Sequence, residues 1–265
     1  MRRVLLAEPE HFVIEEVPIP KPGDQDVIVQ VERSGICGSD VHIYHGTSPL
    51  KPPVVLGHEF VGTVHSLGKE VEGFQVGDRV IVEPGVPCGD CTYCDSGRYN
   101  LCPRQYTIGG YRHHDGGYAD CVRVPAKNLI PMPEGMSFEV AAMVEPVACA
   151  MHALDVAHIQ PGDTVLVMGV GTIGLLVLQA ARMAGATTVI AVDIVPERLK
   201  LAAELGADAV VNASEVDLVP WALKTYGEGG INRIFDTVSN SRSLNQALAM
   251  IRRGGRIIDV GVATE

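Results

Sequence analysis

The hydrophobic and polar positions of this chain follow one pattern in its first half and another in its second. In the first half, short β-branched runs are bounded by Gly, Pro and Asp, and they predict strands at residues 27–35, 60–68 and 78–84. Residues 136–154 are apolar on nearly every face of a helix, with Ser137 and Glu139 suited to its start. The first half is therefore expected to be β-rich, with a helix at its end.

From residue 163 onward, predicted strands and helices alternate. The strands are predicted at residues 164–169, 188–193, 209–211, 233–236 and 256–260. The helices between them are predicted at residues 172–184, 196–205, 216–226 and 241–252. Such alternation, with continuously apolar strands, implies a parallel sheet covered on both faces. We therefore predict an α/β protein with one domain at residues 1–153 and another at residues 154–265.

Composition excludes several classes of protein. The 265 residues are 46% hydrophobic and 20% charged, as in ordinary globular proteins, and the formal net charge is −11 without runs of Lys or Arg. Binding to nucleic acid or to an anionic membrane therefore has no electrostatic support. No apolar run approaches the roughly 20 residues that span a bilayer. The N-terminal apolar run has only four residues before Glu8, which argues against a secretory signal and favours a cytoplasmic protein.

Four cysteines are spaced C-x2-C-x2-C-x7-C, as Cys88, Cys91, Cys94 and Cys102. Four thiolates on a short loop can enclose one tetrahedral Zn2+ and leave no open position, which is typical of a structural site. The surrounding loop is rich in Gly, Pro, Asp and Asn, so the metal is expected to supply its folding energy. Disulfides or scattered small hydrophobic residues are the alternatives, but clustered cysteines in a cytosolic chain favour metal.

The first strand of the second half leads into a G-x-G-x-x-G motif that opens a predicted helix. In this context Gly169 permits the tight turn, Gly171 allows the backbone to approach a pyrophosphate, and Gly174 allows close packing of helix on strand. The helix N-terminus offers its free N–H groups to phosphate. The candidate cofactor residues of this turn are Gly169, Gly171, Thr172, Ile173 and Gly174.

Asp193 lies 19 positions after the last glycine, at the end of the next predicted strand. Its carboxylate can accept both ribose hydroxyls and would repel a 2′-phosphate, so the motif favours NAD over NADP. Arg198 is also a candidate cofactor residue that could soften this preference, although its position favours a side chain that faces solvent or pairs with an acid. The alternative is a glycine-rich turn without a ligand.

A second set of metal donors comes from separate segments: Cys37, His58, Glu59 and Glu145. A thiolate, an imidazole and a carboxylate that leave one position open suit a catalytic zinc. Taken singly, each residue also has an ordinary interpretation as a buried cysteine, a core histidine or a surface acid. The residues alone do not establish that these donors converge.

The motifs together carry a family resemblance. In order along the chain they are G-I-C-G-S-D-x-H, G-H-E-F-x-G, the four-cysteine loop, E-P-x-A-C-A-x-H-A and G-x-G-x-x-G. This series resembles the zinc-dependent medium-chain dehydrogenases, and most closely their polyol (sorbitol- or L-iditol-like) branch. The match extends over essentially the whole chain. It implies a GroES-like catalytic domain followed by a Rossmann domain.

The resemblance also implies roles for individual residues. Cys37 and His58 would be direct ligands of a catalytic zinc, and Glu59 a ligand or a partner of the ligand shell. Glu145 stands where the alcohol dehydrogenases carry a cysteine ligand, and in polyol enzymes it ligates zinc or holds its water. Ser39 would contact the substrate oxygen, and His42 would pass the proton toward solvent.

The implied activity is oxidation of a secondary alcohol of a polyol to a ketone, with hydride transfer to NAD and with two zinc ions per chain. A butanediol or threonine would need similar metal chemistry, so a related dehydrogenase is an alternative. A zinc-free quinone reductase of the same superfamily is disfavoured because both sets of metal donors are present.

The family's members are longer than this chain. We expect the Rossmann sheet to be incomplete at its C-terminus and the chain to be poorly active without a C-terminal extension. A homo-oligomer is expected for a full-length form. The alternative function is therefore that of a truncated, catalytically silent fragment that binds zinc and NAD.

Overall fold

The computed structural model describes residues 1–110, 115–227 and 229–262, and it separates into two compact units, Met1–Glu145 and Pro146–Glu265. The predicted boundary between residues 153 and 154 falls inside helix α4 (Val144–Ala157) and stays a prediction. In the glycine-rich loop around residues 109–117, the sequence favours solvated histidines over histidines that touch substrate; His113 and His114 themselves lie outside the described residues.

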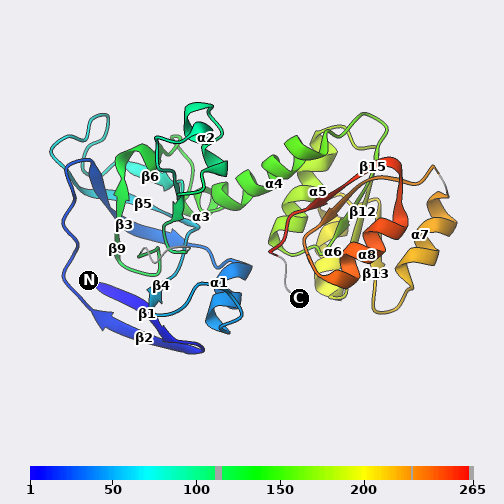
Figure 1. The fold of residues 1–265 in the computed structure, drawn as a ribbon, viewed down its shortest axis with the longest axis horizontal. Helices are drawn as coiled ribbons and strands as arrows, with labels where there is room; N and C mark the ends of the chain where they lie inside the picture. Colours follow the sequence, from blue (N-terminus) through cyan, green and yellow to red (C-terminus); the bar gives the residue numbers. More distant parts are fainter. Residues whose placement is uncertain (111–114, 228, 263–265) are drawn as a thin grey trace. The chain divides into compact units, whose positions relative to one another are not determined.

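The first unit is built from antiparallel sheets (Figure 1). A five-stranded sheet has the order β10-β6-β5-β3-β9, a three-stranded sheet the order β2-β1-β4, and β7 pairs with β8. The strands of this unit are β1 (Arg2–Glu8), β2 (His11–Glu16), β3 (Asp26–Ser34), β4 (Val54–Val55), β5 (Phe60–Leu67), β6 (Arg79–Val82), β7 (Gly85–Val86), β8 (Tyr106–Thr107), β9 (Cys121–Pro125) and β10 (Leu129–Pro131).

The three strands predicted in this unit are confirmed as β3, β5 and β6, which are neighbours in the larger sheet. Their alternating apolar residues, such as Val27, Val29 and Val80, are completely buried in one cluster. Short helical segments connect the strands. They are α1 (Gly38–Tyr44), α2 (Thr92–Asp95), η1 (Tyr99–Leu101), η2 (Ala126–Asn128) and α3 (Phe138–Ala141).

The single helix predicted at residues 136–154 is two helices, α3 and α4. Ser137 caps α3 by accepting a hydrogen bond from the Val140 N–H, as its residue type predicts. The apolar pattern could not locate the break, because α3 packs on the first unit while the later part of α4 packs in the second.

The second unit is a five-stranded parallel sheet with the order β13-β12-β11-β14-β15. The strands are β11 (Thr164–Met168), β12 (Thr188–Asp193), β13 (Ala209–Asn212), β14 (Ile231–Asp236) and β15 (Ile251–Asp259). After α4, the helices are α5 (Thr172–Met183), α6 (Pro196–Glu204), α7 (Leu218–Tyr226) and α8 (Ser241–Met250).

Alternate residues of the central strand face opposite sides of this sheet. Val165 and Val167 pack with α4, α5 and α6, whereas Leu166 and Met168 pack with α7 and α8. Both sides are therefore covered by helices, as the continuous apolar strands predict (Figure 1). The sheet order reverses between β11 and β14, which is the position at which such sheets bind ligands.

The last strand differs from its predicted bounds. Helix α8 ends at Met250, and β15 begins at Ile251 instead of residue 256. Ile231 pairs with Ile251 but Arg233 pairs with Arg256, so the segment around Gly254 bulges between two paired stretches. A glycine-containing bulge interrupts the apolar pattern, which is why the sequence indicated only the second stretch.

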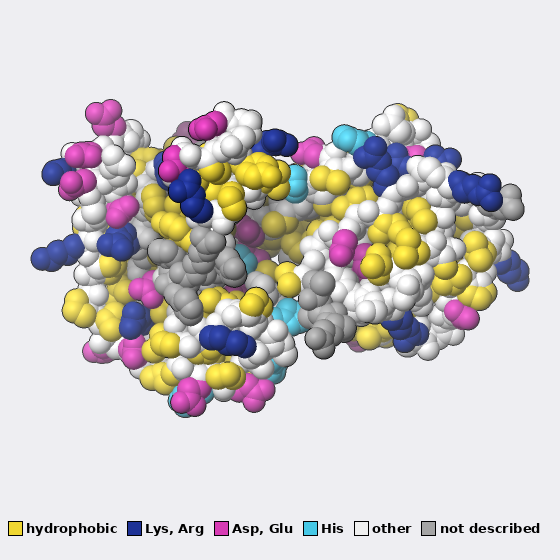
Figure 2. Space-filling view, viewed as in Figure 1, with side chains coloured by type: hydrophobic (Ala, Val, Ile, Leu, Met, Phe, Trp, Pro, Cys, Tyr) yellow, Lys and Arg dark blue, Asp and Glu magenta, His cyan; other side chains and the backbone are white. Residues whose placement is uncertain are grey.

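One helical stretch, Phe138–Ala157, is long and apolar enough to pass a length and composition test for a membrane span. One such stretch is weak evidence, because a core helix of a soluble protein passes the same test. Figure 2 shows apolar, acidic and basic side chains mixed on the visible face of both units. The sequence-based expectation of neither a nucleic-acid nor a membrane partner stays a prediction.

A buried ion pair fixes the C-terminal end of α4 in the second unit. Arg233 is 7% exposed, and its guanidinium lies 3.2 Å from the carboxylate of Asp163, which is 5% exposed. The same guanidinium donates to the carbonyl oxygens of Ala157 and His158, where α4 ends. It therefore satisfies helix carbonyls that have no partner within the helix.

We predict that Arg233→Leu lowers the free energy of unfolding of the second unit by about 3 kcal/mol, because Asp163 would keep a buried, unpaired charge. Urea denaturation followed by fluorescence of Trp221, the single tryptophan, measures this unit. Arg253→Leu is the control, since Arg253 is exposed in the same unit. Equal losses in both variants would show that the ion pair contributes nothing specific.

Candidate metal centres and nucleotide site

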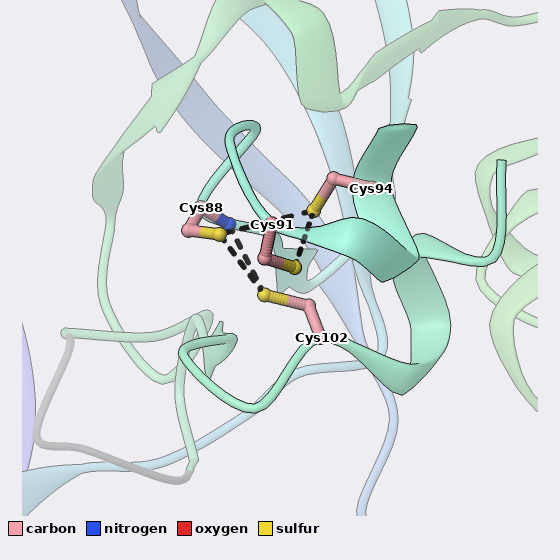
Figure 3. Close-up of side chains that lie close together, drawn as sticks. All are labelled: Cys88, Cys91, Cys94 and Cys102. Carbon is pink, nitrogen blue, oxygen red and sulfur yellow. Dashed lines mark hydrogen bonds between the residues drawn. The ribbon is translucent and has the colours of Figure 1, made fainter. Parts of the chain in front are cut away.

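The four cysteines of the predicted zinc loop lie together, around α2 and η1 (Figure 3). All four sulfurs are within 4.8 Å of one another, and three of the separations are 3.8 Å (Cys88–Cys94), 3.5 Å (Cys91–Cys94) and 3.4 Å (Cys88–Cys102). A tetrahedron with Zn–S bonds of about 2.3 Å has edges of about 3.8 Å. The four thiols therefore fit a closed zinc site.

The cysteines are free, so the disulfide alternative does not describe this loop. Within residues 87–103, Cys102 is the only buried residue, so apolar burial contributes little to the fold of the loop. The Cys88 N–H donates to the Cys102 sulfur at 3.4 Å, and this hydrogen bond is the largest of several contacts that lower the pKa of the Cys102 thiol, whereas the pKa of the neighbouring Cys88 thiol is raised, chiefly by its hydrogen bond with Asp90. A low thiol pKa favours the thiolate, which is the metal-binding form.

A second cluster forms in the same unit from Cys37, His58 and Glu59, whose ligand atoms all lie within 4.8 Å of one another. Cys37 is the N-cap residue of α1, and the other two residues immediately precede β5. The distant segments meet because Gly35, at the end of β3, donates its N–H to the Glu59 carbonyl. A Cβ at Gly35 would lie 2.1 Å from a carboxylate oxygen of Glu59, so a larger residue here would force the Glu59 side chain to move.

Glu145 also contributes to the electrostatics of this cluster, although it does not belong to the set of donors within 4.8 Å. It lies in the first turn of α4. Burial raises the pKa of Glu145, and the negative charges of Glu59 and Asp40 raise it further, while His58 opposes the shift. Burial likewise raises the pKa of Glu59.

His58 shows which charge this cluster favours. Burial would lower the pKa of His58, but the Cys37 thiol and the Asp40 and Glu145 carboxylates outweigh burial and raise this pKa to about 9. Donors that hold an additional proton so strongly create a potential that favours a cation. The donor set of sulfur, nitrogen and oxygen therefore fits a zinc ion as well as a proton.

Asp40 belongs to this centre and was missed by the sequence analysis. It is 4% exposed, and its Oδ1 lies 3.7 Å from His58 Nδ1. Both atoms are buried without a hydrogen-bond partner among the described residues. A carboxylate facing one nitrogen of a histidine is the usual support for a metal-binding imidazole. The available signal was its position three residues after Cys37, in the first turn of α1.

The two residues assigned to proton transfer, Ser39 and His42, both lie on α1. Their spacing of three residues places them on one face of the helix, and both side chains are partly exposed. Ser39 is two residues from Cys37 in the chain. Ser39 therefore lies in the first turn of α1, next to the end where the metal donors gather, and His42 lies in the last turn; their catalytic roles remain proposals.

In the second unit, the glycine motif forms a turn between β11 and α5. Gly169 has a φ of +80°, a conformation that L side chains rarely adopt. A Cβ at Gly174 would lie 1.9 Å from the Gly169 carbonyl oxygen, so helix and strand pack too closely for a side chain. At Gly171 a Cβ would meet no atom within 4 Å, so this glycine leaves open space at the helix N-terminus.

Asp193 has a contact that its sequence position did not predict. Its Oδ2 accepts a hydrogen bond from the Val170 N–H at 2.8 Å, within the glycine turn. Its Oδ1 accepts from the N–H groups of Ile194 and Val195 at 2.8 and 3.0 Å. Arg198 Nη1 lies 3.7 Å from Oδ2, so the arginine pairs with this acid. Asp193 therefore holds the turn as well as facing the cavity.

A cavity of about 780 Å³ opens at the C-terminal ends of β11, β12 and β14. The glycine turn and the acid at the end of β12 both line this cavity. Its lining includes Gly169, Gly171, Asp193, Arg198, Asn240 and Arg242. The open space at Gly171 and the free N–H groups of α5 suit a pyrophosphate. The cavity therefore fits a dinucleotide.

Comparison with known proteins finds one family model in each of the two units. A family model described as "Alcohol dehydrogenase GroES-like domain" matches residues 23–134, and one described as "Zinc-binding dehydrogenase" matches residues 172–265. A sorbitol dehydrogenase from Bacillus subtilis is 35% identical over 269 residues, which cover 100% of this chain and 76% of that protein.

Solved structures include similar proteins with bound nucleotides. A zinc-binding dehydrogenase from Sinorhizobium meliloti bound to NADP is 38% identical with a TM-score of 0.91, covering 99% of this chain and 77% of that one. An alcohol dehydrogenase from Escherichia coli complexed with NADH is 36% identical with a TM-score of 0.92, covering 100% and 77%. The resemblance inferred from the motifs is confirmed, and the chain belongs to the zinc-type medium-chain alcohol dehydrogenase family.

Proposed function

We propose that this protein oxidises a secondary alcohol of a polyol to a ketone, with zinc and NAD as cofactors. The observation that carries the proposal is the cluster of Cys37, His58 and Glu59, whose ligand atoms lie within 4.8 Å of one another. Its preference for positive charge suits a metal ion, and its mixed sulfur, nitrogen and oxygen donors suit a catalytic zinc rather than a structural one. Similarity to a sorbitol dehydrogenase supports the choice of a polyol.

When bound, zinc would polarise the alcohol oxygen and NAD would accept the hydride. Cys37 and His58 would hold the metal, and Glu59 or Glu145 would supply a carboxylate oxygen. Carboxylates make this donor set harder and more hydrophilic than one with a further cysteine, which is compatible with a polyhydroxy substrate. The buried Glu59 and the half-buried Glu145, whose pKa values are raised, are also suited to exchange a proton during the reaction.

The proton of the substrate hydroxyl needs a path to solvent. Ser39 lies beside the donor cluster on α1 and can accept that proton while donating its own. His42 is one turn further along the same face and can pass the proton to water. This pair would perform general base catalysis without a change in the metal donors.

For the nucleotide, we propose that Asp193 gives NAD its advantage over NADP. Its carboxylate is 7% exposed at the edge of the cavity and carries a negative charge where a 2′-phosphate would lie. Arg198 faces the same carboxylate and reduces this repulsion in part. We also propose a cytoplasmic location and a homo-oligomer in a full-length form.

We predict that NADH forms fastest with a polyol when sorbitol, xylitol, L-iditol, a butanediol and threonine are compared. The measurement is kcat/KM for each alcohol from absorbance of NADH. A higher value for threonine or the butanediol would assign the related dehydrogenase activity instead. No NADH from any alcohol, with both zinc ions present, would contradict the proposed function for this chain and favour the alternative of a catalytically silent fragment that binds zinc and NAD.

We predict two zinc ions per folded chain, with separate roles. Cys37→Ser should retain about one zinc and lose activity while its thermal stability is nearly unchanged, because an open site mainly supplies chemistry. Cys91→Ser should lose the other zinc and much of its stability, because the closed site supplies folding energy.

Elemental analysis and thermal unfolding of the same samples measure both effects. Cys149→Ser is the control, since Cys149 is exposed and belongs to neither metal cluster. One zinc or none in the wild type, after expression with sufficient zinc, would contradict the assignment of two centres.

We predict that Asp193→Asn raises the ratio of kcat/KM for NADP to that for NAD by about 10-fold, because it removes a charge that repels the 2′-phosphate. An amide has one acceptor oxygen and cannot serve both Val170 and Ile194, so the activity with NAD should fall as well. Glu197→Gln, an exposed acid four residues away, is the control. An unchanged ratio would show that Asp193 does not select the cofactor.

A further inference from the structure

Tyr118 stands behind the metal cluster at the centre of a group of buried polar contacts. It belongs to the segment that precedes β9, far in sequence from both Cys37 and His58. Its hydroxyl donates to Asp40 Oδ2 at 2.9 Å and lies 3.3 Å from the Gly35 carbonyl oxygen. The shorter contact, to a charged acceptor, is the stronger of the two.

The contacts of Asp40 divide between its two oxygens. Oδ2 accepts hydrogen bonds from the Tyr118 hydroxyl and from the Cys37 N–H, both at 2.9 Å. Oδ1 accepts none from the described residues and faces His58 Nδ1 at 3.7 Å. One side of the carboxylate is therefore anchored, and the other side is directed at the histidine.

The Tyr118 ring is itself held firmly next to His58. Its backbone N–H donates to the Leu56 carbonyl at 3.0 Å, and its carbonyl accepts from the Val4 N–H at 2.8 Å. Gly57 has a φ of +95°, and a Cβ there would lie 2.6 Å from the tyrosine ring. The ring thus packs against the backbone immediately before His58, at a position where only glycine leaves it room.

We propose that Tyr118 is a positioning residue for the catalytic metal centre. By holding Asp40 Oδ2, its hydroxyl keeps Oδ1 directed at His58 Nδ1, which fixes the imidazole and leaves its other nitrogen for the metal. This inference rests on the proposed function, because it assumes that the Cys37 cluster binds zinc. It adds a residue from a third segment, whose only sequence signal is a tyrosine after two glycines.

Removal of the hydroxyl could act in two directions. Without Tyr118 Oη, Asp40 keeps one donor, the Cys37 N–H, and its carboxylate can rotate away from His58. The same loss would concentrate the negative charge of the Asp40 carboxylate and so strengthen its attraction to the His58 imidazole. Orientation should dominate, because Oδ1 and Nδ1 are already 3.7 Å apart, beyond a normal hydrogen bond, and depend on alignment.

The test is the zinc affinity of Tyr118→Phe, measured on the folded chain by competition with a chromophoric chelator. Cys37→Ser should bind zinc only at the four-cysteine site and therefore give the competition curve of that site. The difference between the curve of each other variant and the curve of Cys37→Ser measures zinc binding at the catalytic centre alone. We expect Tyr118→Phe to bind zinc about 3- to 10-fold more weakly at that centre, with unchanged thermal stability. Tyr44→Phe is the matched control, because its hydroxyl donates to the backbone carbonyl of Glu10 in the same unit.

A double-mutant cycle distinguishes positioning through Asp40 from a general structural effect. Asp40→Asn alone should weaken zinc binding by about 10- to 100-fold, and adding Tyr118→Phe should then change little. Three outcomes would overturn the role of Tyr118 while leaving the proposed function intact. They are equal zinc affinity of wild type and Tyr118→Phe, tighter zinc binding by Tyr118→Phe, and additive losses of affinity in the cycle. If wild type binds no more zinc than Cys37→Ser, the proposed function fails and the inference fails with it.

Discussion

Electrostatic repulsion among clustered metal donors is the constraint on which the first unit depends. In the four-cysteine loop, three of the distances between sulfur atoms are 3.4–3.8 Å. In the second cluster, the ligand atoms of a thiol, an imidazole and a carboxylate lie within 4.8 Å of one another. Donors at such distances are compatible only when a proton or a metal ion compensates their charge. The pKa of His58, raised to about 9 against the effect of burial by the Cys37 thiol and the Asp40 and Glu145 carboxylates, expresses this demand for positive charge. The pKa values of Glu59 and Glu145 are raised mainly by burial.

Two glycines in the backbone around these donors allow polar and aromatic side chains to come close together. Gly35 leaves room for the Glu59 carboxylate, and Gly57 leaves room for the Tyr118 ring. Asp40 joins the two segments by accepting from Cys37 and facing His58. The four-cysteine loop has even less apolar burial, so its fold depends on its donors directly.

In the second unit, buried negative charges are stabilised by backbone N–H groups instead of a metal ion. Asp193 and Asp236 are buried acids at the C-terminal ends of β12 and β14, the two strands on either side of β11. Asp193 accepts three backbone N–H groups, and Asp236 accepts two more together with the Ser243 hydroxyl. These contacts hold the loops that line the nucleotide cavity, so cofactor selection and loop structure share residues.

The sequence by itself determined the features that depend on local spacing. The cysteine spacing, the glycine turn and the strand–helix alternation each reflect a short-range rule, and they indicated the four-cysteine site, the nucleotide turn and the fold class. The whole series of motifs indicated the family, and only through that resemblance the donors of the second cluster. Tertiary structure alone decided the break between α3 and α4, the bulge near Gly254, and the roles of Asp40 and Tyr118. Those features arise from contacts between segments far apart in the chain. Such contacts cannot be inferred from residue types, because the type of a residue does not indicate which distant residue packs against it.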